Sequence, residues 1–254
     1  MLRICHISDT HGARIHTRIT IPECDILIHS GDIGGRTDLV ELETFLLWFS
    51  RQPAKYKIFV AGNHDICLDS KWVTNLLGQG RDSEAVFAEV ANHRAIKLVN
   101  EYVKLYPGLI YLDDDSVEIE GLVIYGSPYS PSFHRRNWAF NADRGSEIRT
   151  IWKQIPKNTN ILVTHGPPHG ILDIIPENFK QTPDEDVHRG CEELLKVIET
   201  DLKNLKLHCF GHIHEGPTLI QSIDIEGRPI IFSNGAAVDN RYNLVYSQPP
   251  IIVI

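Results

Sequence analysis

Eight polar side chains of the sequence could do metal chemistry, and each comes just after a short apolar segment. They comprise two acids, one amide and five imidazoles: Asp9, His11, Asp32, Asn63, His64, His165, His212 and His214. This set of nitrogen and oxygen ligands suits Zn, Fe, Mn, Ni or Cu, whereas a Mg or Ca site would be mostly oxygen. Eight side chains are too many for one catalytic metal that keeps an open position. Two metal ions that share a bridging carboxylate would use the set well.

Paired metal ions have a characteristic chemistry in proteins. They sit about 3.5–4 Å apart and clamp both the attacking and the leaving oxygen of an in-line displacement at phosphorus. A water that bridges them loses its proton near neutral pH and becomes the nucleophile. A single histidine at the end of a strand is usually structural. Five such segments in one chain are hard to produce by chance, so the pattern indicates phosphoryl chemistry.

The apolar segments that precede these side chains are predicted to be strands. They cover residues 2–8, 25–30, 57–61, 161–164 and 207–210, and a glycine follows each within a few residues. A helix is expected over 38–52, because its leucines and phenylalanines recur with helical spacing. Strand–helix–strand order implies a parallel crossover sheet, whose sites lie beyond the carboxyl ends of its strands.

The other elements are predicted from local pattern. Helices are expected over 83–93, 145–155 and 191–204, hairpins over 117–125 and 219–232, and a final strand over 251–254, while 66–80 is expected to be irregular. No internal repeat and no low-complexity linker interrupts the chain. The sequence therefore predicts a single domain over residues 1–254.

Composition excludes several classes of protein. The net charge of −8 over 254 residues argues against broad nucleic-acid binding, which needs a basic face. The five cysteines are scattered and form no CxxC pair, which favours reduced thiols and a cytoplasmic location. The first residues are too polar for a signal peptide, and no apolar run is long enough for a membrane span.

Five blocks of the chain together resemble the signature of the calcineurin-like metallophosphoesterase superfamily. In order they are Asp9-Thr10-His11, Gly31-Asp32, Gly62-Asn63-His64-Asp65, Thr164-His165-Gly166 and Gly211-His212-Ile213-His214. The resemblance implies an α/β fold, a four-layer α/β/β/α sandwich of two mixed β-sheets flanked by helices.

The resemblance also implies the role of each site residue. One divalent ion would be held by Asp9, His11, Asp32 and His214. The other would be held by Asp32, Asn63, His165 and His212, with Asp32 as the bridge. Manganese is the expected metal, with iron or zinc as alternatives. His64 would face the leaving-group oxygen as a proton donor or charge stabiliser, oriented by Asp65.

Further segments are similar to the small single-domain metallophosphoesterase-domain group. These are 125–128, 137–141, 164–168, 189–195 and 210–216. That group is associated with hydrolysis of phosphodiesters, cyclic nucleotides included, so a small phosphodiester is the expected substrate. A nuclease, a phosphomonoesterase or protein phosphatase with the same centre, and a non-catalytic scaffold of the same fold remain alternatives. The oligomeric state is open.

Five of the other histidines, together with the aromatic loop over 127–141, divide into two groups. His6, His29 and His208 lie within predicted strands, where we expect satisfied core groups or partners that orient metal ligands. Substrate contacts are expected instead from His169 and from His134 and Trp138 of the loop, because long loops of this kind tend to be functional.

Overall fold

Two large mixed β-sheets form the middle of the molecule in a computed structural model that describes residues 1–133, 138–179, 186–215 and 219–254. The first sheet has the order β13-β1-β2-β3-β4. Its strands are β1 (Arg3–Ile7), β2 (Cys24–Ser30), β3 (Ala54–Val60), β4 (Leu109–Tyr111) and β13 (Ile251–Val253). Strands β1 to β4 run parallel, and β13 pairs antiparallel with β1.

The second sheet has the order β11-β12-β10-β9-β6-β5. Its strands are β5 (Asp115–Ile119), β6 (Leu122–Ser127), β9 (Ile161–Thr164), β10 (Leu207–Phe210), β11 (Ile220–Ile225) and β12 (Arg228–Asn234). The inner four strands are parallel, and an antiparallel hairpin partner closes each edge. A short parallel pair, β7 (Ser130–Pro131) with β8 (Asn141–Ala142), stands apart from both sheets.

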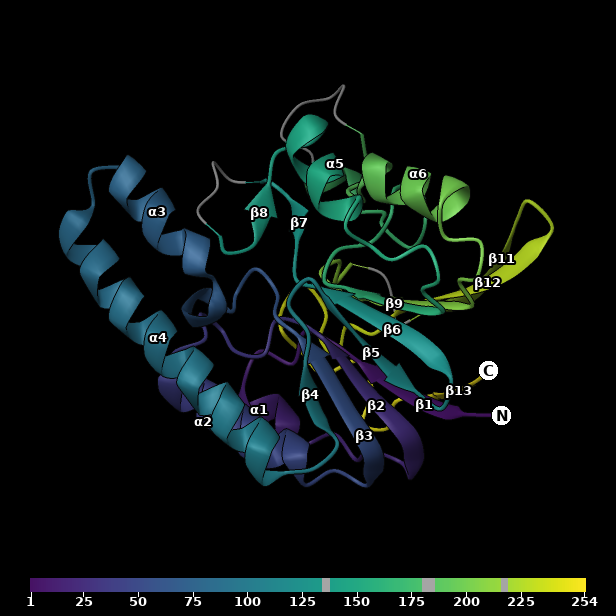
Figure 1. Cartoon of the computed structure of the whole chain (residues 1–254), viewed down its shortest axis with the longest axis horizontal. Coiled ribbons are helices and arrows are strands. Elements are labelled where there is room, and N and C mark those ends of the chain that lie inside the picture. The colour runs from purple at the N-terminus through teal and green to yellow at the C-terminus, as the bar shows by residue number, and fades with distance from the viewer. Residues whose placement is uncertain (134–137, 180–185, 216–218) are drawn as a thin grey trace.

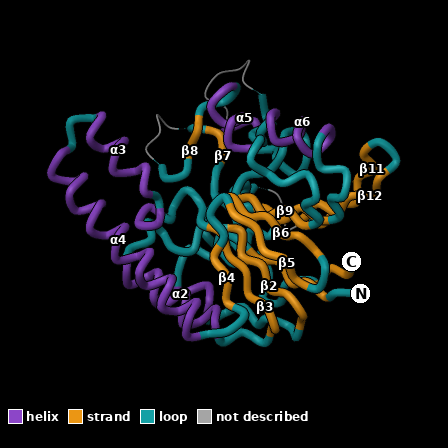
Figure 2. The backbone as a smooth tube through the Cα atoms, in the orientation of Figure 1, coloured by secondary structure: helices purple, strands orange, loops and turns teal. Residues whose placement is uncertain are grey.

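Helices flank the two sheets, as Figure 1 and Figure 2 show. The helices are α1 (Ala13–His16), α2 (Leu39–Ser50), α3 (Ser70–Gly78), α4 (Asp82–Leu105), α5 (Ser146–Trp152) and α6 (Glu192–Thr200), with short 3-10 turns at Ile66–Leu68 and Glu177–Phe179. Helices α2 and α4 lie beside the first sheet, and α5 and α6 lie over β6 and β9 of the second (Figure 1). The expected two-sheet architecture flanked by helices is confirmed.

The hydrophobic core fills both the space between the sheets and the space under the helices. Alternate side chains of β2 show the division, because Ile26 and Ile28 pack between the sheets whereas Leu27 packs on the helical side. On that side Phe45 of α2 contacts Phe59 of β3, with ring centroids 5.4 Å apart. Strands buried on both faces explain why these segments read as nearly continuous apolar runs.

The structure corrects the predicted elements at two places. Residues 70–78 form α3, where an irregular segment was expected, and the Asp69 side chain caps this helix by accepting from the backbone N–H of Lys71 at 2.8 Å. Helix α4 continues to Leu105, beyond the predicted end at 93. No proline or glycine occurs in 82–105, so the next effective stop is the Pro107-Gly108 pair.

Among the residues that the structure describes, no helix combines the length and the apolar character needed to cross a membrane.

Candidate metal centre

Five parallel strands deliver the candidate ligands to one end of the molecule. In the first sheet, the ligand positions follow the carboxyl ends of β1, β2 and β3, and in the second they follow β9 and β10. Neighbouring parallel strands end side by side, so residues distant in sequence meet there. The strands thus position the side chains that the sequence singled out.

Backbone hydrogen bonds continue past the strands and hold the ligand loops together. The N–H of Asp9 donates to the carbonyl of Gly31 at 2.9 Å, and the N–H of His11 donates to the carbonyl of Asp32 at 3.1 Å. In the second sheet the N–H of Gly211 donates to the carbonyl of His165 at 2.9 Å. Each loop is therefore fixed by its neighbour.

The first group of candidate ligands contains Asp9, His11 and His214, whose ligand atoms lie within 4.8 Å of one another. His214 Nε2 lies 3.0 Å from Asp9 Oδ1 and 3.4 Å from His11 Nε2. The buried Asp9 carboxylate also accepts from the backbone N–H of His212. Burial alone would raise the pKa of Asp9, but the hydrogen bond from His214 and its charge hold that pKa well below its usual range.

The second group contains Asp32, His165 and His212, again within 4.8 Å. His165 Nε2 lies 3.4 Å from Asp32 Oδ1 and 2.8 Å from Asn63 Oδ1. Asp32 also belongs to a third group, with His11 and His64. The structure therefore places Asp32 between the other candidate ligands, where the sequence predicted a bridging carboxylate.

The donor chemistry of these groups fits divalent metal ions. His165 Nδ1 donates to the carbonyl of Ser30 at 2.9 Å, so Nε2 of the neutral ring is an acceptor. It faces the oxygens of Asn63 and Asp32, which are acceptors too. Burial lowers the pKa of His165, but the Asp32 carboxylate outweighs it and raises the pKa to about 9, so without a metal ion Nε2 carries a proton that both oxygens can accept. A divalent ion would replace that proton, and the three atoms would then all be acceptors, which is a donor set that a cation satisfies.

His64 lies beside this centre, but Asp65 does not orient it. The imidazole Nδ1 of His64 donates to the carbonyl of Gly35, and Nε2 lies 3.9 Å from Asp32 Oδ2. The ring packs against Trp138, with centroids 4.3 Å apart. The predicted pairing of His64 with Asp65 is therefore wrong, because the N–H group at Nδ1 already donates its hydrogen bond to the Gly35 carbonyl.

Asp65 instead binds the backbone of the ligand loops. Its buried carboxylate accepts from the N–H groups of Asp32, Ile33 and Gly62 at 3.0, 2.9 and 2.7 Å, and from the Thr37 hydroxyl at 2.5 Å. Burial raises its pKa to about 7, and the nearby Asp32 charge adds to this. Asp65 thus fixes the turn that carries Asp32.

The three expected substrate contacts have different outcomes. Trp138 supports His64, and the Arg36 guanidinium lies over the Trp138 ring, 5.5 Å from its centroid. The described lining of the cavity beside the candidate ligands includes neither Trp138 nor His169, so their contact with a substrate stays a prediction. The backbone N–H of His169 donates to the Cys191 carbonyl, and its ring packs against His188 with centroids 5.3 Å apart. His134 lies outside the described residues.

A cavity of about 270 Å³ opens onto the candidate ligands. Its described lining comprises Asp32, Asn63, His64, Phe133, His212, His214, Glu215, Asn240 and Tyr242. The sequence prediction missed Phe133, Glu215, Asn240 and Tyr242. Phe133 belongs to the aromatic loop and Glu215 directly follows the ligand His214, whereas Asn240 and Tyr242 belong to no motif and reach the pocket only through the fold.

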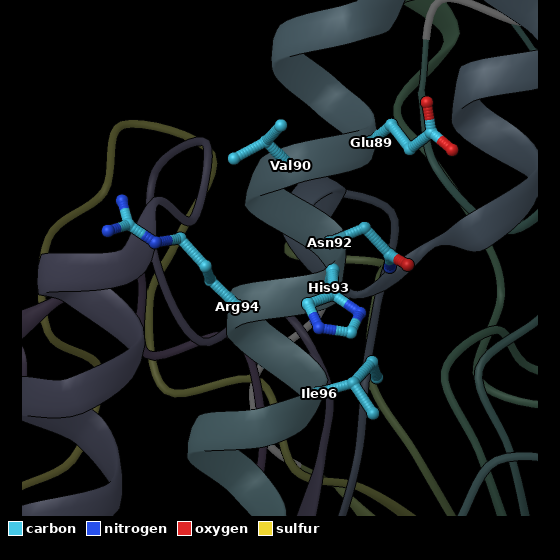
Figure 3. A pocket seen from close by; sticks show the side chains of 6 residues that line it. All are labelled: Glu89, Val90, Asn92, His93, Arg94 and Ile96. Carbon is cyan, nitrogen blue, oxygen red and sulfur yellow. The ribbon is translucent and has the colours of Figure 1, made fainter.

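A larger cavity, of about 690 Å³, lies along α4 and holds no candidate ligand group (Figure 3). Its lining side chains come from one helix and include Glu89, His93 and Arg94. Since the ligand groups meet at the smaller pocket, the chemistry belongs there.

The strand histidines are buried core groups, as predicted, and each has a hydrogen-bond partner, although Nδ1 of His208 has none among the described residues. His6 bonds to the hydroxyls of Ser233 and Ser30 at 2.8 and 2.9 Å. His29 bonds to Thr10, between two ligand positions, at 3.0 Å, and His208 bonds to a threonine hydroxyl at 2.8 Å. Burial lowers the pKa of His208 to about 3, so this ring is neutral at physiological pH.

Comparison with known proteins identifies the family. Residues 2–216 match the protein family described as "Calcineurin-like phosphoesterase". The chain belongs to the calcineurin-like phosphoesterase family. Membership supports a metal-dependent phosphoesterase, because this family typically binds divalent metals and the described residues include the candidate ligand groups.

Two relatives of this calcineurin-like phosphoesterase are informative. Human Metallophosphoesterase domain-containing protein 1 is 36% identical over 214 residues, which cover 84% of this chain and 61% of that protein. A UPF0046 protein of Caenorhabditis elegans is 33% identical over 253 residues, covering 100% of this chain and 75% of the worm protein. The chain thus spans about three fifths of the length of the human relative.

Solved structures agree on the fold. Phosphopantetheinyl hydrolase from Mycobacterium tuberculosis has a TM-score of 0.57 at 16% identity, covering 98% of this chain and 95% of that one. The protein TT1561 of Thermus thermophilus also has a TM-score of 0.57, at 10% identity, covering 94% of this chain and 89% of its own. At these identities the likeness concerns the fold alone.

Proposed function

We propose that this protein hydrolyses small phosphodiesters, cyclic nucleotides among them, with two divalent metal ions, manganese foremost. The observation that carries the proposal is the position of Asp32, which shares ligand groups with His11 and His64 on one side and with His165 and His212 on the other. A carboxylate between two ligand groups is the feature of a two-metal site that acts on phosphorus.

The pocket supports a diester rather than a monoester. Of the described residues that line it, none is a lysine or an arginine, and Glu215 adds an acid. A phosphomonoester is largely a dianion at neutral pH. The two metal ions would supply positive charge at phosphorus, and no described lining side chain adds a fixed cation for the second charge of a monoester. A phosphodiester, with one negative charge, suits this lining better.

The size of the pocket and the charge of the chain support a small substrate. The cavity of about 270 Å³ lies below the range of about 300–1,000 Å³ that is usual for drug-sized ligands. The net charge of −8 disfavours a nuclease that tracks along a polyanion. The free state of all five cysteines supports a cytoplasmic setting.

Divalent ions at this centre, when bound, supply Lewis-acid activation of water and stabilise charge at phosphorus. The protein's own part is positional. Asp65 fixes the backbone of the turn that carries Asp32. His64 is oriented by the Gly35 carbonyl and supported by Trp138, which leaves Nε2 as the ring atom that would serve as proton donor to the oxygen of the leaving group.

A metal-by-substrate matrix tests the proposal. Protein stripped of metal and reloaded with Mn, Fe, Zn or Mg is assayed on bis-p-nitrophenyl phosphate, p-nitrophenyl phosphate and cyclic nucleotides. We expect metal-dependent turnover that is faster on the diesters. Faster turnover of the monoester would favour a phosphatase, and well-loaded protein without turnover on any of them would favour the scaffold.

The variant Asp32→Ala sharpens the test. Metal content and diester hydrolysis should be lost together, because two of the three candidate ligand groups contain this acid and they share it between the two sides of the centre. Asp115→Ala, which removes an exposed acid of β5, is the matched control and should change neither. Full metal content in Asp32→Ala would contradict the two-metal assignment.

A further inference from the structure

Two pocket residues come from a part of the chain that the family description does not reach. The match to the family ends at residue 216, yet Asn240 and Tyr242 line the cavity together with the candidate ligands. Both belong to a turn between β12 and β13. This segment therefore adds to the pocket something that the five signature blocks do not contain.

The Tyr242 ring stands against two candidate ligands of the same group. Its centroid lies 4.9 Å from that of His11 and 5.9 Å from that of His214, edge-on in both cases. Half of the residue's surface, 50%, stays exposed. The two histidines thus brace the ring while much of its surface faces the pocket and solvent.

The turn holds Tyr242 in an unfavourable backbone conformation. Its φ of +59° lies in the left-handed region, which a bulky residue rarely adopts. The Asp239 carboxylate accepts from the N–H groups of Arg241 and Asn243 at 2.9 and 2.8 Å, and the Asp239 carbonyl accepts from the N–H of Tyr242 at 2.9 Å. Conformations of this kind persist where the surroundings fix them and cluster at ligand sites.

The opposite group of ligands has its own aromatic neighbour. Phe133 contacts His212, with ring centroids 5.2 Å apart. The pocket therefore has one aromatic ring beside each ligand group and no fixed cation among its described lining residues. The part of the substrate that is not phosphate would meet an aromatic surface rather than a charged one.

We propose that Tyr242 determines specificity by stacking on a planar aromatic group of the substrate, such as a nucleobase. The proposal rests on the proposed function, because it concerns the same pocket. Phenol rings offer a flat, rigid surface at low entropic cost, and nucleobases stack on aromatic side chains with little dependence on sequence. We choose Tyr242 over Phe133 because Tyr242 is half exposed and its turn has a fixed conformation, so its ring is accessible to a substrate in a defined position.

Two cyclic phosphodiesters with and without a base give the test. 2′,3′-Cyclic AMP and glycerol 1,2-cyclic phosphate share the five-membered ring that reacts, and only the first carries a base. The readout is the ratio of their kcat/KM values. Tyr242→Ala should lower this ratio about tenfold, mainly through KM for cyclic AMP, as expected for loss of one base–aromatic stack.

Two further variants test how the ring acts. Tyr242→Phe keeps the ring and should keep the ratio within about twofold of the wild type, since stacking does not need the hydroxyl. Asp239→Ala loosens the turn and should lower the ratio in the same direction by a smaller factor. Val245→Ala, in the same segment and 43% exposed, is the matched control and should leave both activities unchanged.

Three results would overturn the proposal. Equal losses on both substrates in Tyr242→Ala would show a structural role, and no loss on either would show no contact. A fall of the ratio in Phe133→Ala but not in Tyr242→Ala would place the base at the other ring.

Failure of the proposed function gives a different signature. If the wild type prefers monoesters, the same ratio is measured with AMP and glycerol 2-phosphate, and Tyr242→Ala should lower it by the same factor. If the wild type turns over neither pair, equilibrium dialysis compares AMP with glycerol 2-phosphate as ligands. Loss of the preference for AMP in Tyr242→Ala would support the proposal, and an unchanged preference would overturn it.

Discussion

Replacement of Asp65 by alanine tests the assignment of this acid to the backbone of the ligand loops. The buried carboxylate accepts from the N–H groups of Asp32, Ile33 and Gly62 and from the Thr37 hydroxyl. Alanine leaves all four donors without this partner. Each buried donor that stays unsatisfied costs roughly 1–3 kcal/mol.

The expected loss of stability follows from these bonds. Three backbone donors alone would sum to roughly 3–9 kcal/mol, but neighbouring losses are not additive and water can enter the space of the carboxylate. We therefore expect the free energy of unfolding to fall by roughly 3–4 kcal/mol, a large fraction of the stability of a typical domain. Urea denaturation with chelator present in every sample measures it, because chelation removes the contribution of metal binding.

A matched variant separates this role from general damage. Asp173 is equally buried and accepts from the N–H groups of Gly170 and Gly190 at 2.9 Å each, and it pairs with His188. Asp173→Ala should destabilise the protein by roughly 2–3 kcal/mol yet retain metal, whereas Asp65→Ala should lose metal as well. Plasma mass spectrometry after gel filtration gives the metal content.

One result would refute the reasoning. If Asp65→Ala unfolds at the wild-type urea concentration, keeps its metal and slows turnover as His64→Ala does, Asp65 acts through the imidazole. The hydrogen bonds of Asp65 to the loops that follow β2 and β3 (Figure 1) would then contribute nothing to stability or metal binding. Asp65 would act on His64 even though Nδ1 of His64 donates to the Gly35 carbonyl.

Three other replacements make separate predictions. His64→Ala should keep its metal and slow turnover most for diesters with poor leaving groups, and equal losses across a leaving-group series would exclude proton donation. Gly211→Ala should lower metal affinity in a chelator titration, because an added methyl group would overlap the Asp9 carboxylate. The hydrogen bond with Asp173 raises the pKa of His188, so its stabilising effect is full below the unfolded pKa of about 6.5 and lost as pH rises through the folded value. The difference in unfolding free energy between wild type and His188→Ala should therefore shrink from pH 5.5 to 8.5, and growth of that difference would contradict the assignment.

The sequence predicted the candidate centre well because its information is local. Each block shows within a few residues a strand followed by a glycine and a ligand, as at Gly31-Asp32. The parallel pairing of the strands then brings the blocks to the same edge of the sheet. Buried His6 and His208 were also predicted, since a histidine inside an apolar strand must find a partner in the core.

The errors come from contacts that have no local trace. Asp65 follows His64 in the chain, so adjacency suggested a pair, but its acceptor role is set by N–H groups some thirty residues away. His169 follows His165 closely, yet its ring packs against His188 and the described lining of the cavity does not include it. Tyr242 lies in a polar turn that reads as surface, and only the fold returns it to the pocket.

Backbone conformation adds an argument that no motif contains. Four candidate ligands have φ in the left-handed region: Asp9 at 51°, His11 at 45°, Asp32 at 57° and His212 at 69°. This region costs roughly 1–2 kcal/mol for a residue other than glycine. Glycine would relieve the cost at each position, and a loop with only a structural role would favour it.

The left-handed backbone at these four ligands must be held by contacts with the rest of the protein. Bonds between loops, such as that from the N–H of Asp9 to the carbonyl of Gly31, hold the strained turns through the protein's own backbone. Glycine at 62 and 211 lets the backbone approach Asp32 and Asp9 where any side chain would collide. These contacts within the protein position the ligands, as expected of a site whose geometry serves a reaction.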